Sequence, residues 1–172
     1  MKSFIFYLLF FSLLLGKTIE EYETEKKVDQ LLFLVQKRLS LMHEVAKVKW
    51  NQNLPIEDKK REEIILNAIS EKTGSNPWIM AFFKAQIESA KDMQSSDFTC
   101  WKSYGIKQLD TELSLDASLR AYIDRLNSEM LELLLNISEE DFNHYVLKNP
   151  ISIRESDSIP QGVWNRAINP VK

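Results

Sequence analysis

The stretch over residues 31–50 repeats its apolar side chains at the period of an α-helix, and one face of that helix carries two cations. The apolar members of this face are Leu31, Val35, Met42 and Val45. Arg38 and Lys49 are eleven residues apart, so at roughly 100° per residue they point within about 20° of each other. A buried cation without a partner costs several kcal/mol, so both cations need an anion. The pattern predicts an anion-binding pocket inside a helical bundle.

The composition favours an all-α fold. The chain has 172 residues with only 4 Gly and 5 Pro, whereas β-sandwiches and barrels need many turn residues. This length suits one domain whose core is large enough to be stable without disulfide bonds or bound metal ions. We therefore expect a single-domain helical bundle.

Breaks in the apolar pattern delimit the expected elements. We expect helices over residues 20–50, 56–72, 77–95, 115–137 and 139–147. Pro55 cannot continue the first helix, Asn76 before Pro77 is a typical N-cap for the third, and Ser138 is expected to cap the last. Residues 96–114 are expected to form a less regular link. One amphipathic turn at residues 163–168 is expected to pack as a lid or brace.

The N-terminal segment, residues 1–16, has the features of a secretory signal peptide. Lys2 supplies a positive charge, and an apolar run over residues 4–15 ends at Gly16. Such a run is too short to span about 30 Å of hydrocarbon. The expectation is therefore a periplasmic or secreted protein, with an uncleaved N-terminal anchor as the alternative.

Charge and sulfur content exclude several kinds of site. A formal net charge of −3 argues against a general nucleic-acid binder, so an anion site has to be built from local cations. Cys100 is the single cysteine and is expected to be a small core residue, while two His and one Cys make a zinc site improbable.

Further polar residues interrupt the apolar pattern at helical spacing. Their positions are Asp58, Arg61 and Glu62 beside Ile65; Gln86 and Gln94, which are both expected to look inward; and Arg120 near Leu119 and Ile123. Each has a purely structural alternative. Arg38 could bridge to Asp58 or Glu62, Lys49 could complement the helix dipole from a helix end, and Gln94 could bond backbone. The cationic, multi-helix character of the set favours a ligand pocket.

Four segments resemble a known enzyme family. They read RLSLM (residues 38–42), VAKVKW (45–50), LPIEDKKRE (54–62) and FFKAQIESAKDMQ (82–94). Their spaced set of Arg, Lys, Asp, Arg, Glu and Gln across three helices is similar to that of the helical chorismate mutases. The signal-like start and a second helical half that reaches Arg120 resemble the exported, gamma subclass.

The resemblance implies a fold and an activity. The fold would be a chorismate mutase II bundle over residues 17–172, with a core at 20–101 and an additional C-terminal helical half at 114–172. Such enzymes rearrange chorismate to prephenate in aromatic amino-acid biosynthesis by an intramolecular pericyclic shift. The reaction uses no cofactor and no metal.

The resemblance also implies roles for individual residues. Arg38 and Arg120 would hold the two carboxylates of chorismate, since the guanidinium fork suits carboxylates. Arg61 would bond one of them or order the pocket. Lys49 and Gln94 would donate to the ether oxygen, where negative charge develops as the C–O bond breaks.

The remaining matched positions are acidic, and two departures accompany them. Asp58 and Glu62 would position the ring hydroxyl and the neighbouring cations. Ala90 stands where the family often has a substrate-contacting hydroxyl, and no cysteine pair is present to tie down the C-terminal half. As in the exported subclass, Arg120 would come from the same chain as the rest of the site.

The sequence leaves two alternatives open. One is an isochorismate–pyruvate lyase, which shares the fold and similar cations; the other is an inactive secreted helical binding or effector protein. The expected partner is the chorismate dianion, without nucleic acid and without stable membrane association after signal removal. The resemblance is also compatible with a homodimer.

Overall fold

The computed structural model describes residues 18–149 and 159–169, and within these ranges the regular elements are all helical. They are α2 (Ile19–Ser40), α3 (Met42–Asn51), α4 (Lys59–Thr73), α5 (Pro77–Ser103), the π-helical turn η1 (Leu115–Leu119), α6 (Arg120–Leu134), α7 (Glu139–Lys148) and α8 (Gln161–Ile168). The expected all-α fold is confirmed. The expected signal peptide, residues 1–16, lies outside the described residues.

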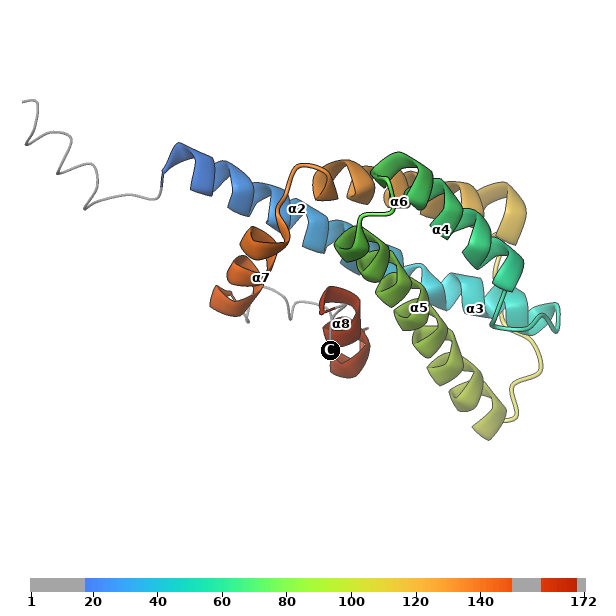
Figure 1. Ribbon diagram of the computed structural model, residues 1–172. Coiled ribbons are helices and arrows are strands. Elements are labelled where there is room, and N and C mark those ends of the chain that lie inside the picture. Colours follow the sequence, from blue (N-terminus) through green and yellow to red (C-terminus); the bar gives the residue numbers. More distant parts are fainter. Residues whose placement is uncertain (1–17, 150–158, 170–172) are drawn as a thin grey trace, which may run out of the picture.

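The helix expected over residues 20–50 is two helices joined at Leu41. The amide of Leu41 still donates to Lys37 O at 3.3 Å, and the amide of Val45 donates to Leu41 O at 3.1 Å. These bonds keep α2 and α3 nearly in line, as Figure 1 shows. The apolar face is therefore continuous, and all four of its predicted members are buried.

Helix α4 begins three residues later than expected, at Lys59, because Asp58 is its N-cap rather than a first-turn residue. The Asp58 carboxylate accepts the amide of Arg61 at 3.1 Å, which satisfies one of the free amides at a helix start. Gly74 ends α4 with φ of 60°, a left-handed conformation that glycine adopts without strain.

Helix α5 starts as predicted and ends later than predicted. The Asn76 side chain caps the amides of Trp78 and Ile79 at 3.1 and 3.2 Å. The expected end at residue 95 was wrong, because the helix continues to Ser103. In the added turns Phe98 and Trp101 pack on Trp50, with ring centroids 5.1 and 5.7 Å away.

The expectation that Cys100 is a core residue was wrong. Its side chain is exposed. The aromatic contacts of Phe98 and Trp101 to α3 partly bury the other face of this last part of α5, so Cys100 lies away from the packed side.

The helix expected over residues 115–137 opens with η1, and Ser114 caps it by accepting the amide of Ala117 at 3.1 Å. α6 follows and ends at Leu134. Ser138 caps α7 as expected, accepting the amide of Asp141 at 3.0 Å.

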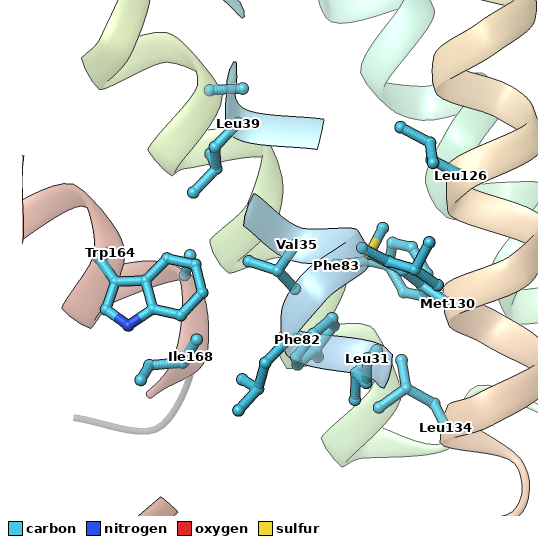
Figure 2. Close-up of a cluster of buried hydrophobic side chains, with 14 of the residues drawn as sticks. Leu31, Val35, Leu39, Phe82, Phe83, Leu126, Met130, Leu134, Trp164 and Ile168 are labelled. Atoms are coloured by element: carbon cyan, nitrogen blue, oxygen red, sulfur yellow. The ribbon is translucent and has the colours of Figure 1, made fainter. Parts of the chain in front are cut away.

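The core lies between two groups of helices. The nearly collinear helices α2 and α3 are called the α2–α3 rod. Figure 1 shows α4 and α6 on one side of this rod, with α7 and α8 on the other. In Figure 2 Leu126, Met130 and Leu134 of α6 approach Leu31 and Phe83 from one side, while α8 contributes from the opposite side.

Helix α8 packs against α5 as a brace, which is one of the two roles expected for it. Trp164 and Ile168 are buried against the core (Figure 2). Ser89 of α5 donates to the carbonyl of Val163 at 3.2 Å, and Gln86 donates to that of Ala167 at 2.8 Å.

Candidate functional site

A cavity of about 100 Å³ lies where α2, α3, α4, α5 and the start of α6 meet. Every predicted site residue lines it: Arg38, Lys49, Asp58, Arg61, Glu62, Gln94 and Arg120. Lys91 lines it as well, so five cations face two carboxylates among the lining residues. The remaining lining is aliphatic. Such a cavity suits a small anion with an apolar body.

Arg38 is only 4 % exposed, and its partners are uncharged. Its Nε donates to Oδ1 of Asn127 and its Nη1 to the carbonyl of Gln86, both at 3.0 Å. The bridge to Asp58 or Glu62 that the sequence left open is not among its contacts in the described residues. Burial lowers the pKa of Arg38 to about 10, so it is charged at neutral pH.

Lys49 projects into the cavity and is 7 % exposed. Its Nζ donates to the carbonyl of Ile56 at 2.6 Å. Burial lowers the pKa of Lys49, the carboxylates of Asp58 and Glu62 raise it, and Arg120 lowers it, with burial the largest effect. The amine is therefore a buried donor rather than a solvated charge at a helix end.

Ion pairs join α4 to α6 at the edge of the cavity. Arg120 donates from Nη2 to Oδ2 of Asp58 at 2.8 Å, and Arg61 pairs with Asp124. Because Asp58 also caps α4, the position of this helix start depends on the arginine of α6.

The two inward glutamines of α5 have different surroundings. Gln94 lines the cavity, and its Nε2 donates to Ala90 O at 2.9 Å, while its buried Oε1 has no partner among the described residues. Gln86 is fully buried but bonds Ala167 of α8 instead. The prediction that both amides look inward is confirmed, although Gln94 alone of the two lines the cavity.

Two polar residues were not singled out from the sequence, Lys91 in the cavity lining and Asn127, which supports Arg38 from outside the lining. The Nζ atom of Lys91 lies 3.6 Å from Oε2 of Glu62 and 2.7 Å from Oε1 of Glu88. The hydrogen bond to Glu88 is the largest of the effects that raise the pKa of Lys91. Lys91 lies three residues before Gln94, a spacing that places both on one helix face, and this pattern could have identified it. Asn127 follows Arg120 by about two turns, and this spacing likewise places the two residues on one face of their helix.

The described part of the chain meets the requirements of neither a membrane span nor a metal site. In residues 18–149 and 159–169, no helix combines the length with the apolar character that a bilayer-spanning helix requires. The same residues contain no cluster of three His, Cys, Asp or Glu side chains suited to a metal ion.

Comparison with known proteins gives one family description. Residues 27–95 match the family model for chorismate mutase type II. A secreted chorismate mutase of Mycobacterium tuberculosis is 30% identical over 121 residues, which are 68% of this chain and 60% of that relative. The match thus spans less than two thirds of the relative's length.

Two solved structures have similar folds. A chorismate mutase from Burkholderia thailandensis superimposes with a TM-score of 0.68 at 24% identity, over 85% of this chain and 99% of that one. A secreted chorismate mutase from Yersinia pestis has a TM-score of 0.60 at 26% identity, over 83% of this chain and 97% of that one. These similarities cover more of the chain than residues 27–95.

Proposed function

The chain belongs to the type II family of chorismate mutases, and we propose that it rearranges chorismate to prephenate. The observation that carries the proposal is the cavity itself, in which two buried cations from the α2–α3 rod meet cations from α4, α5 and α6. Chorismate carries two carboxylates on a mostly apolar frame. Five lining cations against two lining carboxylates leave the positive excess that such a dianion requires.

Arg38 and Arg120 are proposed to hold the two carboxylates of chorismate. Arg38 is buried and has no carboxylate among its hydrogen-bond partners in the described residues. Arg120 is held by Asp58 at 2.8 Å, which fixes its direction. Arg61, held by Asp124, would order the entrance or add one bond. Fixed arginines bind carboxylates with defined geometry.

Lys49 and Gln94 are proposed to meet the charge that appears during the reaction. As the C–O bond of the ether breaks, negative charge builds on its oxygen, and preorganised donors there lower the barrier. The Lys49 ammonium is a buried donor in the cavity. The Gln94 amide carries two N–H groups, of which one bonds Ala90 O, and the other would donate to the ether oxygen.

The remaining contribution is conformational. The reaction is unimolecular, and the flexible enolpyruvyl arm of chorismate has to adopt a chair-like shape over the ring. Confinement between Arg38, Arg120 and aliphatic side chains such as Val45 would favour that shape. Asp58 and Glu62 would orient the ring hydroxyl and the cations. Because Ala90 has no hydroxyl to offer, a backbone group or a water molecule would bond the substrate there.

The direct test incubates purified protein with chorismate and follows its disappearance together with prephenate formation. Formation of prephenate is expected. Turnover of isochorismate alone, with release of pyruvate, would identify a lyase instead. A well-folded protein that turns over neither substrate would identify the inactive binding protein and end the enzyme proposal.

The kcat/KM, whose pH dependence reports the free enzyme, should fall on the alkaline side. Burial lowers the pKa of Lys49 below its ordinary value of 10.5 and that of Arg38 to about 10. Rising pH removes the positive charges of Lys49 and Arg38. The decline of kcat/KM with rising pH should therefore start before pH 10.5, the ordinary pKa of a lysine. Gln94 does not titrate and adds no acidic limb.

A matched variant checks this assignment. Gln94→Glu should add a dependence on acid, because a carboxylate at this position has to be protonated before it can donate. An unchanged profile in Gln94→Glu would contradict the proposed role of residue 94.

We also propose that residues 1–16 direct export and that the protein acts in the periplasm or outside the cell. The apolar run after Lys2 and the relatives named as secreted support this proposal. Fractionation of a producing cell followed by N-terminal sequencing tests it, with a new N-terminus near residue 17 expected. A homodimer is proposed on the family resemblance, and light scattering after gel filtration tests it.

A further inference from the structure

Arg38 is held in place by two oxygen atoms of neutral groups. Its Nε donates to Oδ1 of Asn127 and its Nη1 to the carbonyl of Gln86, each at 3.0 Å. Arg38 and Asn127 are 4 % and 8 % exposed. A guanidinium has five N–H donors, so three remain for other acceptors. Its orientation is restrained while its positive charge is left for an anion in the cavity.

Asn127 lies behind Arg38 rather than beside the substrate position. It is absent from the lining of the substrate cavity and instead lines a neighbouring cavity of about 210 Å³ between α4 and α6, next to Ser128 and Leu131. Its effect on a bound anion would therefore pass through Arg38.

The other support of Arg38 is equally well anchored. The Gln86 backbone belongs to α5, and the Gln86 side chain donates to the carbonyl of Ala167 in α8 at 2.8 Å. Arg38 of α2 is thus tied to α5 by one bond and to α6 by the other. Of these two supports, Asn127 is the one contributed by a side chain, and so it is the one that substitution can change.

The amide is the group that orients Arg38 without neutralising it. An aspartate would have the same shape and would make a stronger, charge-assisted bond. Its negative charge would cancel that of Arg38 and compete with a substrate carboxylate. Burial lowers the pKa of Arg38, which is the behaviour of a desolvated cation that stands to gain from an arriving anion.

We propose that Asn127 is a positioning residue that orients Arg38 for a substrate carboxylate while leaving its charge uncompensated. This inference rests on the proposed function, because the carboxylate is that of chorismate. The chain offers three informative variants: Asn127→Ala removes the bond, Asn127→Asp keeps its shape and adds charge, and Asn136→Asp adds the same charge away from the cavity, at an exposed asparagine whose side chain donates to Glu132 O.

The expected results separate positioning from packing. In Asn127→Asp the KM for chorismate should rise about tenfold or more, since one bond to a charged group corresponds to roughly that factor, while the melting temperature stays at or above that of the wild type. In Asn127→Ala the KM should rise and the melting temperature should fall. In Asn136→Asp the KM should stay at the wild-type value, while the melting temperature should fall slightly, because a carboxylate cannot donate to Glu132 O. In both Asn127 variants kcat should change less than KM.

A merely structural asparagine would behave differently. The isosteric Asn127→Asp would then restore both stability and a wild-type KM, and this result would overturn the proposal. If the wild type itself turns over no chorismate, the proposed function fails, and the Nε–H NMR resonance of Arg38 decides about Asn127. Slow hydrogen exchange that is lost in Asn127→Ala supports positioning, whereas fast exchange in the wild type overturns it.

Discussion

Replacement of Lys49 by alanine is expected to lower kcat at least about 10²-fold, the effect typical of removing one preorganised donor from a developing oxyanion. The ammonium is buried in the cavity, and alanine leaves no donor in its place. Charge on the ether oxygen arises only in the transition state, so the loss should appear in kcat more than in KM. Steady-state kinetics with chorismate measures both.

Lys47→Ala is the matched control. Lys47 lies on the same helix, forms an ion pair with Glu44 at 2.6 Å and is absent from the cavity lining. It should retain wild-type kinetics, and both variants should retain the helical circular dichroism spectrum. A Lys49→Ala enzyme with wild-type kcat would show that the proposed role of this amine is wrong.

Replacement of Gln94 by alanine is the second large effect, with kcat again expected to fall at least about 10²-fold. The neutral amide donates at any ordinary pH. The fold-decrease in kcat should therefore be the same at every pH at which Lys49 is charged. Gln86→Ala is a stringent comparison, because Gln86 is a second buried glutamine of the same helix. Its amide bonds Ala167 of α8 and does not line the cavity.

The two glutamine variants should therefore fail in opposite ways. Gln86→Ala should lower the free energy of unfolding by about 1–3 kcal/mol, the cost of leaving the buried Ala167 carbonyl without its donor, with kcat close to that of the wild type. Gln94→Ala should show the opposite pattern, a large loss of kcat with only a small loss of stability. Equal losses of kcat in the two variants would mean that neither amide acts on the reacting oxygen.

The site residues were predictable where helix geometry alone relates them. Arg38 and Lys49 share a face because of their eleven-residue spacing, and both are buried in the cavity. The same reasoning, together with the family resemblance, identified all the other predicted lining residues. It did not identify Lys91 or Asn127, because charged and amide residues at helical spacing are common on solvated faces.

Helix ends and exposures were less predictable, since they depend on contacts made elsewhere. Helix α4 starts at Lys59, later than expected, because Asp58 acts as its N-cap. The extension of α5 to Ser103 follows from aromatic packing on Trp50. That same packing direction leaves Cys100 at the surface. A local pattern does not contain the neighbour that buries or exposes a side chain.

The sequence by itself determined the helical class and the direction in which Arg38 and Lys49 point, because both depend on the helical repeat over a few turns. Only the tertiary structure decided what Arg38 meets. Its partners lie 48 and 89 residues away in the chain, on α5 and α6. The choice of the neutral Asn127 over the carboxylates of α4 comes from how the helices pack, since the packing determines which oxygen atoms come within reach of a buried cation.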